Sequence, residues 1–201
     1  MRFSSLFCAL FFLSLFSSVP LWQTPPLTSS SSPIAAKISV TGISNAGKIS
    51  DHLYRGAQPY LSNLAELKKL GIDTIVDLRA EFPQTRNRER LKAESLGIRF
   101  ISIPVGGFFT PSSAQLAEFF HLLREAPPQT VFVHCEFGDD RTGAFIAAYR
   151  IAFDHWSADQ ALAEMDAFGF HRRWHPNMAS FVRALPALLH SDPTLKSALP
   201  N

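Results

Sequence analysis

The sequence predicts an α/β fold, with one domain built on a central, mostly parallel sheet of about four or five strands flanked by helices. Short β-branched runs alternate with amphipathic runs of helical length, which is typical of strand–helix repeats. The apolar run at 130–133 has the pattern of a strand buried on both faces. A chain of 201 residues is long enough for one such domain plus an appendage.

The N-terminal part of the chain predicts a targeting segment and a linker. Residues 1–22 begin with Met-Arg and continue as an apolar run, which predicts a signal peptide or a signal anchor. The run is close to the ~20 residues that span a bilayer, so export and a membrane tether both stay open. Residues 23–36 are rich in Pro, Ser and Thr and predict a linker. We therefore expect a folded domain over 37–192 and a C-terminal tail over 193–201.

Within that domain the elements follow from apolar periodicity and from capping residues. Ser62 and Ser112 or Ser113 can cap helices, and Gly71 can end one. The strands are expected at 37–41, within 52–59 where a strand ends in a turn, and at 73–79, 98–104 and 130–133. The helices are expected at 62–70, 82–97, 112–123, 141–154, 157–168 and 176–190. The helix at 82–97 is rich in basic residues, which we interpret as a solvated outer face.

The stretch between the strand at 130–133 and the next helix carries the chemistry. Cys135 is followed by five residues and then by Arg141, where the helix begins. A tight loop at a helix N-terminus turns backbone N–H groups toward one point, and with the helix dipole they form a seat for a dianionic phosphate. The same field favours the thiolate of Cys135 over the thiol. The planar guanidinium of Arg141 can hold two phosphate oxygens, and Gly138 allows an unusual backbone angle.

This pattern resembles a known family. His134-Cys-x5-Arg-Thr-Gly143 is similar to the signature of the cysteine-dependent protein tyrosine phosphatase superfamily, in its small, atypical dual-specificity-like branch of bacterial type. Tyr54-Arg-Gly-Ala-Gln-Pro59 resembles a second signature near the start of such domains. The resemblance implies a dual-specificity phosphatase-like fold. It also implies hydrolysis of phosphomonoesters through a phosphocysteine intermediate, as in tyrosine and dual-specificity protein phosphatases, without a metal or other cofactor.

The resemblance also implies roles for single residues. Cys135 is the expected nucleophile, and Arg141 is expected to bind the equatorial phosphate oxygens. His134 is expected to fix the geometry of the loop and to assist formation of the thiolate. Thr142 is expected to donate its hydroxyl to the sulfur. The backbone groups expected to bind phosphate belong to Glu136, Phe137, Gly138, Asp139, Asp140 and Arg141.

One expected part of the family's site is missing. The loop at 106–111, where relatives often carry an aspartic general acid, contains no acidic residue. Asp140 is our candidate for that acid, because Gly-x-Asp-Arg-Thr-Gly resembles loops in which an Asp has been proposed to donate the proton. The alternative is that Asp140 only pairs with Arg141 or with a neighbouring base. Asp139 is the weaker candidate and is expected to point to solvent.

Several other polar residues have weaker assignments. Arg55 contacts the substrate or forms a structural ion pair. Asp77 and Arg79 end a strand at the edge where α/β ligand sites gather, and the resemblance implies that they buttress the site. The run at 171–175 holds two histidines and two arginines, but a metal site there needs an acidic or thiolate ligand that this stretch lacks. We predict a solvated or substrate-facing loop and no metal.

Charge and cysteine content exclude several classes of protein. The net charge is +2 with mixed signs, so no nucleic-acid partner is expected. The second cysteine, Cys8, lies in the N-terminal segment, which leaves the domain without a disulfide or a cysteine zinc cluster. A non-catalytic phosphate-binding module stays possible. A sulfurtransferase also stays possible, although those enzymes place four residues before the basic position rather than five.

The substrate stays open between a phosphorylated protein and a lipid or inositol phosphate. Asp139 and Asp140 stand where related inositol-pyrophosphate phosphatases carry Lys-His. Like charges in a partly desolvated site repel, so we expect highly phosphorylated inositols to be poor substrates and monoesters to be better ones.

Overall fold

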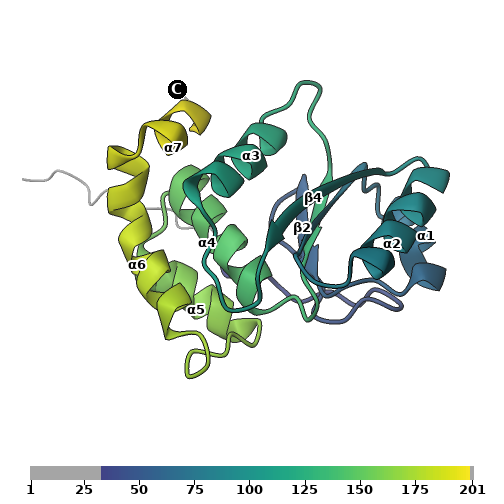
Figure 1. The fold of residues 1–201 in the computed structure, drawn as a ribbon, viewed down its shortest axis with the longest axis horizontal. Coiled ribbons are helices and arrows are strands. Elements are labelled where there is room, and N and C mark those ends of the chain that lie inside the picture. Colours follow the sequence, from purple (N-terminus) through teal and green to yellow (C-terminus); the bar gives the residue numbers. More distant parts are fainter. Residues whose placement is uncertain (1–32, 200–201) are drawn as a thin grey trace, which may run out of the picture. The chain divides into compact units, whose positions relative to one another are not determined.

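The computed structural model describes residues 33–199, and these form an α/β domain of the predicted class (Figure 1). Its five-stranded sheet has the order β1-β2-β5-β3-β4. Only β1 is antiparallel to its neighbour; the other pairs are parallel. The strands are β1 (Gly47–Lys48), β2 (Leu53–Gly56), β3 (Thr74–Arg79), β4 (Arg99–Val105) and β5 (Val131–His134). The expected signal segment and most of the expected linker lie outside the described residues.

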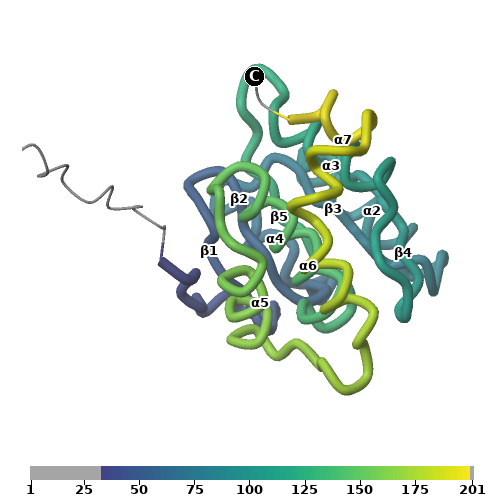
Figure 2. Tube along the Cα trace, turned by 90° about the vertical axis from the view of Figure 1, so that its left-hand side faces the viewer, coloured from purple at the N-terminus to yellow at the C-terminus, as the bar shows by residue number. Residues whose placement is uncertain are grey.

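Helices cover both faces of the sheet. A short 3-10 helix, η1 (Leu61–Asn63), precedes α1 (Leu64–Lys69), and α1 lies with α2 (Pro83–Ser95) on one face (Figure 1). The other face carries α3 (Ser113–Leu123), α4 (Asp140–Phe153), α5 (Ala158–Ala167), α6 (Pro176–Ser191) and α7 (Pro193–Ala198). Figure 2 shows α5 and α6 in front of α4, so α4 lies between them and the sheet.

The central position of β5 follows from its sequence. Side chains alternate across a strand, so Val131 and Val133 enter one core while Phe132 enters the core on the opposite face. All four residues of β5 are buried, as expected for a central parallel strand. Within residues 33–199, no helix is long and apolar enough to cross a membrane.

The structure corrects three boundaries. Residues 193–198, expected in a tail, form α7, because Leu195 and Ala198 bury apolar side chains in the core shared with α3 and α6. The domain also begins before residue 37, since the N–H of Ala35 donates to Oε1 of Glu164 at 2.8 Å. The expected strand at 37–41 makes only isolated bridges, from Lys37 and Val40.

A buried chain of alternating charges joins β3, α2 and β5. Nε of Arg79 donates to Oδ1 of Asp77 at 2.8 Å, and Nη2 donates to Oε2 of Glu89 at 2.6 Å. The other oxygen of Glu89 lies 2.9 Å from Nε2 of His134. Nδ1 of His134 lies 2.9 Å from the carbonyl oxygen of Cys135, which can only accept, so Nδ1 carries a hydrogen. Asp77 and Arg79 are buried in the structural position expected for them.

The charge state of His134 follows from this chain. Burial lowers the pKa of His134, but the attraction and hydrogen bonding of Glu89 outweigh burial and raise the pKa above its ordinary value. A raised folded-state pKa means that protonation of His134 stabilises the fold. That contribution is complete below the unfolded-state pKa and is lost as the pH rises through the folded-state value.

We predict that Glu89→Gln lowers the pKa of His134, measured by NMR titration of its ring protons. Each unit of that fall corresponds to about 1.4 kcal/mol of stability lost at acid pH. The free energy of unfolding should therefore drop more at about pH 5.5 than at about pH 9. Glu94→Gln on the exposed face of α2 is the matched control and should change neither quantity. An unchanged His134 titration in Glu89→Gln would contradict this account.

Candidate active site

The site lies where the carboxyl ends of the parallel strands meet. The loop of residues 135–141, here called the phosphate loop, leaves the central strand β5 and enters the first turn of α4. Cys135 is its first residue and is buried at the base. Residues that follow β2, β3 and β4 lie beside it, which is the usual place for a ligand site in an α/β sheet.

Several backbone N–H groups of the phosphate loop make no hydrogen bond with the described residues. The N–H groups of residues 136–139 and 141 donate to no acceptor within residues 33–199. They can therefore donate to an anion, and the positive end of α4 adds to the attraction. The backbone N–H of Asp140 was expected to bind phosphate as well, but it already donates at 2.7 Å to Oδ1 of Asp139. Asp139 occupies the N-cap of α4, where a carboxylate satisfies a free helical N–H.

Gly138 fixes the turn of the loop. Its φ is 73°, and a Cβ there would lie 2.4 Å from the backbone carbon of Gly56. Its carbonyl accepts from Nη2 of Arg55 at 2.5 Å and from Nδ2 of Asn45 at 3.1 Å. Asn45 also donates to the carbonyl of Phe168 at 2.8 Å, so it ties the loop to the end of α5.

Arg55 therefore supports the loop from behind. Its side chain is fully buried and stacks on the ring of Phe168, with Cζ 4.0 Å from the ring centroid. This geometry favours a structural role over the substrate contact that the sequence left open, and the partner is the carbonyl of Gly138 rather than an acidic side chain. Burial lowers the pKa of Arg55 to about 10, which still leaves it charged at neutral pH. Its Nε and Nη1 have no hydrogen-bond partner among the described residues.

Arg141 is oriented by a carboxylate that the sequence analysis did not single out. Nη1 and Nη2 lie 2.9 and 2.8 Å from the two oxygens of Glu81, and Nη1 also donates to the carbonyl of Val105 at 3.2 Å. Burial lowers the pKa of Arg141, but Glu81 and Cys135 more than offset it and the pKa is raised. Glu81 could have been found from its position two residues after the end of β3, because residues that follow the strands of a parallel sheet often contribute to ligand sites.

Thr142 stands one residue beyond Arg141 and is fully buried. Its hydroxyl makes no hydrogen bond with the described residues, so the expected bond to the sulfur of Cys135 is not formed in this structure. A buried hydroxyl without a partner keeps its donor available for such a bond.

The two aspartates of the loop meet the segment that precedes α6. Oδ1 of Asp140 accepts from the N–H of His171 at 2.9 Å, and its Oδ2 lies 3.2 Å from Nε2 of His175. Asp139 does not point to solvent, since it is buried and its Oδ2 lies 3.5 Å from Nδ1 of His171. Burial, joined by repulsion from Asp140, raises the pKa of Asp139 above its ordinary value. Asp140 thus pairs with neighbouring bases and not with Arg141.

These polar groups form the floor of an aromatic pocket of about 290 Å³. Its walls are the rings of Phe108, Phe137 and Trp174, all largely exposed to solvent. Phe108 comes from the loop that lacks the expected acid, and its ring stacks on His175 with centroids 5.2 Å apart. The pocket thus combines apolar walls with carboxylates at one end.

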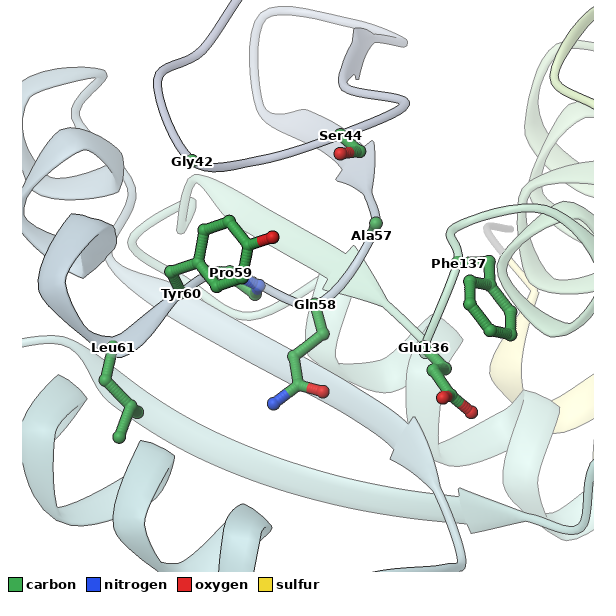
Figure 3. A pocket seen from close by; sticks show the side chains of 9 residues that line it. All are labelled: Gly42, Ser44, Ala57, Gln58, Pro59, Tyr60, Leu61, Glu136 and Phe137. Carbon is green, nitrogen blue, oxygen red and sulfur yellow. The ribbon is translucent and has the colours of Figure 1, made fainter.

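A second pocket, of about 430 Å³, reaches the phosphate loop at Glu136 and Phe137 (Figure 3). Glu136 and Phe137 lie at one end and Tyr60 and Leu61 at the other, with Gln58 between them. The N–H of Gln58 donates to the carbonyl of Glu136 at 3.1 Å, which fixes this wall to the loop. Phe137 lines both pockets, so both open beside the phosphate loop.

Comparisons with known proteins agree with this geometry. The family described as "DSP-PTPase phosphatase fused to NAD+ Kinase" matches residues 33–178. The dual specificity protein phosphatase TpbA of Pseudomonas aeruginosa is 29% identical over 126 residues, which cover 63% of this chain and 55% of that protein. The chain thus spans just over half the length of this curated relative.

Solved structures show the same fold. A crystal structure of P. aeruginosa TpbA superposes with a TM-score of 0.64 at 27% identity, covering 80% of this chain and 99% of that one. The structure of P. aeruginosa TpbA in complex with pTyr superposes with a TM-score of 0.63 at 25% identity, covering 80% of this chain and 98% of that one. The core catalytic domain of the PP-IP phosphatase SIW14 from S. cerevisiae superposes with a TM-score of 0.61 at 21% identity, covering 78% of this chain and 98% of that one. The chain belongs to the cysteine-dependent protein tyrosine phosphatase superfamily, in its atypical dual-specificity branch.

Proposed function

We propose that this protein hydrolyses phosphate monoesters through a phosphocysteine intermediate, as a tyrosine or dual-specificity protein phosphatase. The observation that carries the proposal is the phosphate loop, in which unpaired N–H groups and Arg141 surround the buried Cys135. The thiolate attacks phosphorus and the bond to the leaving oxygen breaks, which leaves a phosphoryl group on sulfur. Water then attacks phosphorus, the S–P bond breaks, and phosphate departs with the thiolate restored.

Arg141 is prepared for this reaction by Glu81. The carboxylate occupies the edge of the guanidinium formed by Nη1 and Nη2, which leaves Nε and the second hydrogen of Nη2. That remaining edge can bind two equatorial oxygens of the phosphoryl group. Because Glu81 holds the plane fixed, the donors are already oriented when charge spreads over those oxygens in the transition state.

Asp140 is the proposed proton donor to the leaving oxygen. It lines the aromatic pocket and is the first residue of α4. The backbone N–H of His171 and the ring of His175 hold its carboxyl in place. When the leaving oxygen departs, the proton of the carboxyl goes to it. In the second half-reaction the resulting carboxylate can take a proton from the attacking water.

The aromatic walls favour an aryl phosphate as substrate. The rings of Phe108, Phe137 and Trp174 can pack on the ring of a phosphotyrosine while the phosphate occupies the loop. Asp139 and Asp140 oppose additional negative charge near the same mouth. The structure of TpbA with pTyr supports this choice, and the likeness to SIW14 keeps inositol phosphates as the second candidate.

Residues 1–22 support a proposal about location by composition alone. Export, or a tether to the membrane, fits their apolar run. Fractionation of cells that express the full chain would test it, and recovery in the cytosol would contradict it.

We predict that a phosphotyrosine peptide is turned over with a higher kcat/KM than an inositol pyrophosphate. The measurement is a kinetic comparison of the purified protein over aryl, peptide, lipid and inositol phosphates. Charge repulsion from Asp139 and Asp140 should make the gap wider at low ionic strength, because salt screens it. A higher kcat/KM for the inositol pyrophosphate would overturn the choice of substrate while leaving the proposed chemistry intact.

We predict that iodoacetate inactivates the protein at about pH 6 and that phosphate or vanadate protects it, because the loop stabilises a thiolate at Cys135. Cys135→Ser should abolish turnover and still bind vanadate, measured by calorimetry. That result separates catalysis from phosphate binding. Turnover of an aryl phosphate by Cys135→Ser at near the parent rate would sink the covalent mechanism.

We predict that Asp140→Asn slows hydrolysis of phenyl phosphate by ~10²–10⁴-fold and that of a nitrophenyl phosphate far less, since a good leaving group needs no proton. The basic limb of the pH–rate profile for phenyl phosphate should flatten. Asp139→Asn is the matched comparison, because Asp139 is the neighbouring carboxylate of the loop. Equal losses on both substrates would assign Asp140 to structure.

A further inference from the structure

The structure gives the histidines at 171–175 the acidic neighbours that their own stretch lacks. Asp139 and Asp140 come from the phosphate loop, and His171 and His175 come from the segment before α6. One ligand atom each from Asp139, Asp140 and His171 lie within 4.8 Å of one another. Two chain segments far apart in sequence therefore bring carboxylate and imidazole ligands to one point.

The spacing of these atoms fits a small divalent cation. Nδ1 of His171 lies 3.5 Å from Oδ2 of Asp139 and 3.4 Å from Oδ2 of Asp140. Nε2 of His175 lies 3.2 Å from the same oxygen of Asp140. Zinc bonds of ~2.0–2.1 Å in a tetrahedron place neighbouring ligand atoms about 3.3 Å apart. The two distances from His171 lie close to that value, and so does the distance from His175 to Asp140.

The orientation of the carboxylates fits the same purpose. Oδ1 of Asp139 is engaged by the N–H of Asp140, and Oδ1 of Asp140 is engaged by the N–H of His171. Each carboxylate therefore uses one oxygen for a backbone bond and presents the other, Oδ2, to the histidines. Hydrogen bonds of this kind orient the ligands of metal sites.

His175 is an independent sign of a ligand. Its side chain is only 10% exposed, its Nδ1 has no hydrogen-bond partner among the described residues, and its Nε2 points at Oδ2 of Asp140. Either ring nitrogen of a histidine can bind a metal, and Nε2 is the one that lies beside the carboxylates, 3.2 Å from Oδ2 of Asp140. Its ring is also fixed by stacking on Phe108.

Charge balance adds a reason for a cation. Asp139 and Asp140 are both largely buried beside a loop built to bind a phosphate dianion. The nearest arginine of the loop, Arg141, is already paired with Glu81. A divalent cation bound by both carboxylates would neutralise two like charges that otherwise repel each other and the substrate.

We propose that Asp139, Asp140 and His171, with His175 beside them, form a binding site for a divalent cation of the zinc class at the mouth of the phosphate loop. The mixture of imidazole and carboxylate suits Zn²⁺ better than Mg²⁺ or Ca²⁺, which prefer oxygen ligands. Bound metal would hold Asp140 as a carboxylate and prevent it from donating a proton. That consequence rests on the proposed function, whereas metal binding does not.

The test uses the full chain carrying Cys8→Ser and Cys135→Ser, without a histidine tag, so that neither of the two cysteines binds metal and no turnover occurs. Co²⁺ is titrated and followed by its visible absorption, and Zn²⁺ is then added to displace it. We expect one Co²⁺ per chain, with the strong absorption of a tetrahedral site. Adding His171→Ala should weaken binding by at least roughly tenfold, because loss of even a supporting residue costs that much.

Controls separate the site from other causes. His121→Ala removes an exposed histidine on α3 and should leave Co²⁺ binding unchanged. His171 is 55% exposed, so His171→Ala should fold, which circular dichroism verifies. Asp139→Asn should also weaken binding. The proposal is overturned by a lack of saturable binding at one Co²⁺ per chain, or by equal affinity in the parent and in His171→Ala.

Discussion

The active-site loop depends above all on the buried chain of charges that runs from Asp77 to His134. Buried ions are costly unless each has a partner, and here every member has one within 2.9 Å. This series of ion pairs ends at His134, whose Nδ1 donates to the carbonyl of Cys135. A shift of the nucleophile would therefore disturb contacts of β3 and α2 as well as of β5. The position of the sulfur is thereby fixed by elements that never touch a substrate.

The middle of the loop is fixed by a second set of buried donors. Arg55 and Asn45 both donate to the carbonyl of Gly138, and the left-handed backbone at that glycine turns its carbonyl away from the mouth. When the carbonyls of a loop are satisfied from behind, its N–H groups are left facing the opposite side. The anion-binding property of the loop thus follows from the positions of Arg55 and Asn45, which bind its carbonyl. Arg141 adds a positive charge to the same site.

What the sequence could predict was local. Cys135, Arg141 and the start of α4 follow from one short stretch, and the order of strands and helices follows from periodicity, so the fold class is confirmed. The missing information was long-range. Nothing near Arg55 in sequence shows that it will be buried against Gly138, 83 residues away. Likewise, α7 lacks a strong pattern of its own and is recognisable only because Leu195 reaches the core.

The same limit explains why the position of Asp139 was misread. Asp139 was expected to point to solvent because its position is variable in related loops, but it is the N-cap of α4 and lies beside the segment at 171–175, and it is buried. In a site designed around an anion, two buried carboxylates are tolerated only if positive charge approaches them. The imidazoles of His171 and His175 are the groups that approach these carboxylates, at 3.2 to 3.5 Å, and the proposed cation would lie between the same groups. Asp139 and Asp140 therefore form one unit with the segment at 171–175. The net charge of this unit affects how strongly a phosphate is attracted to the loop.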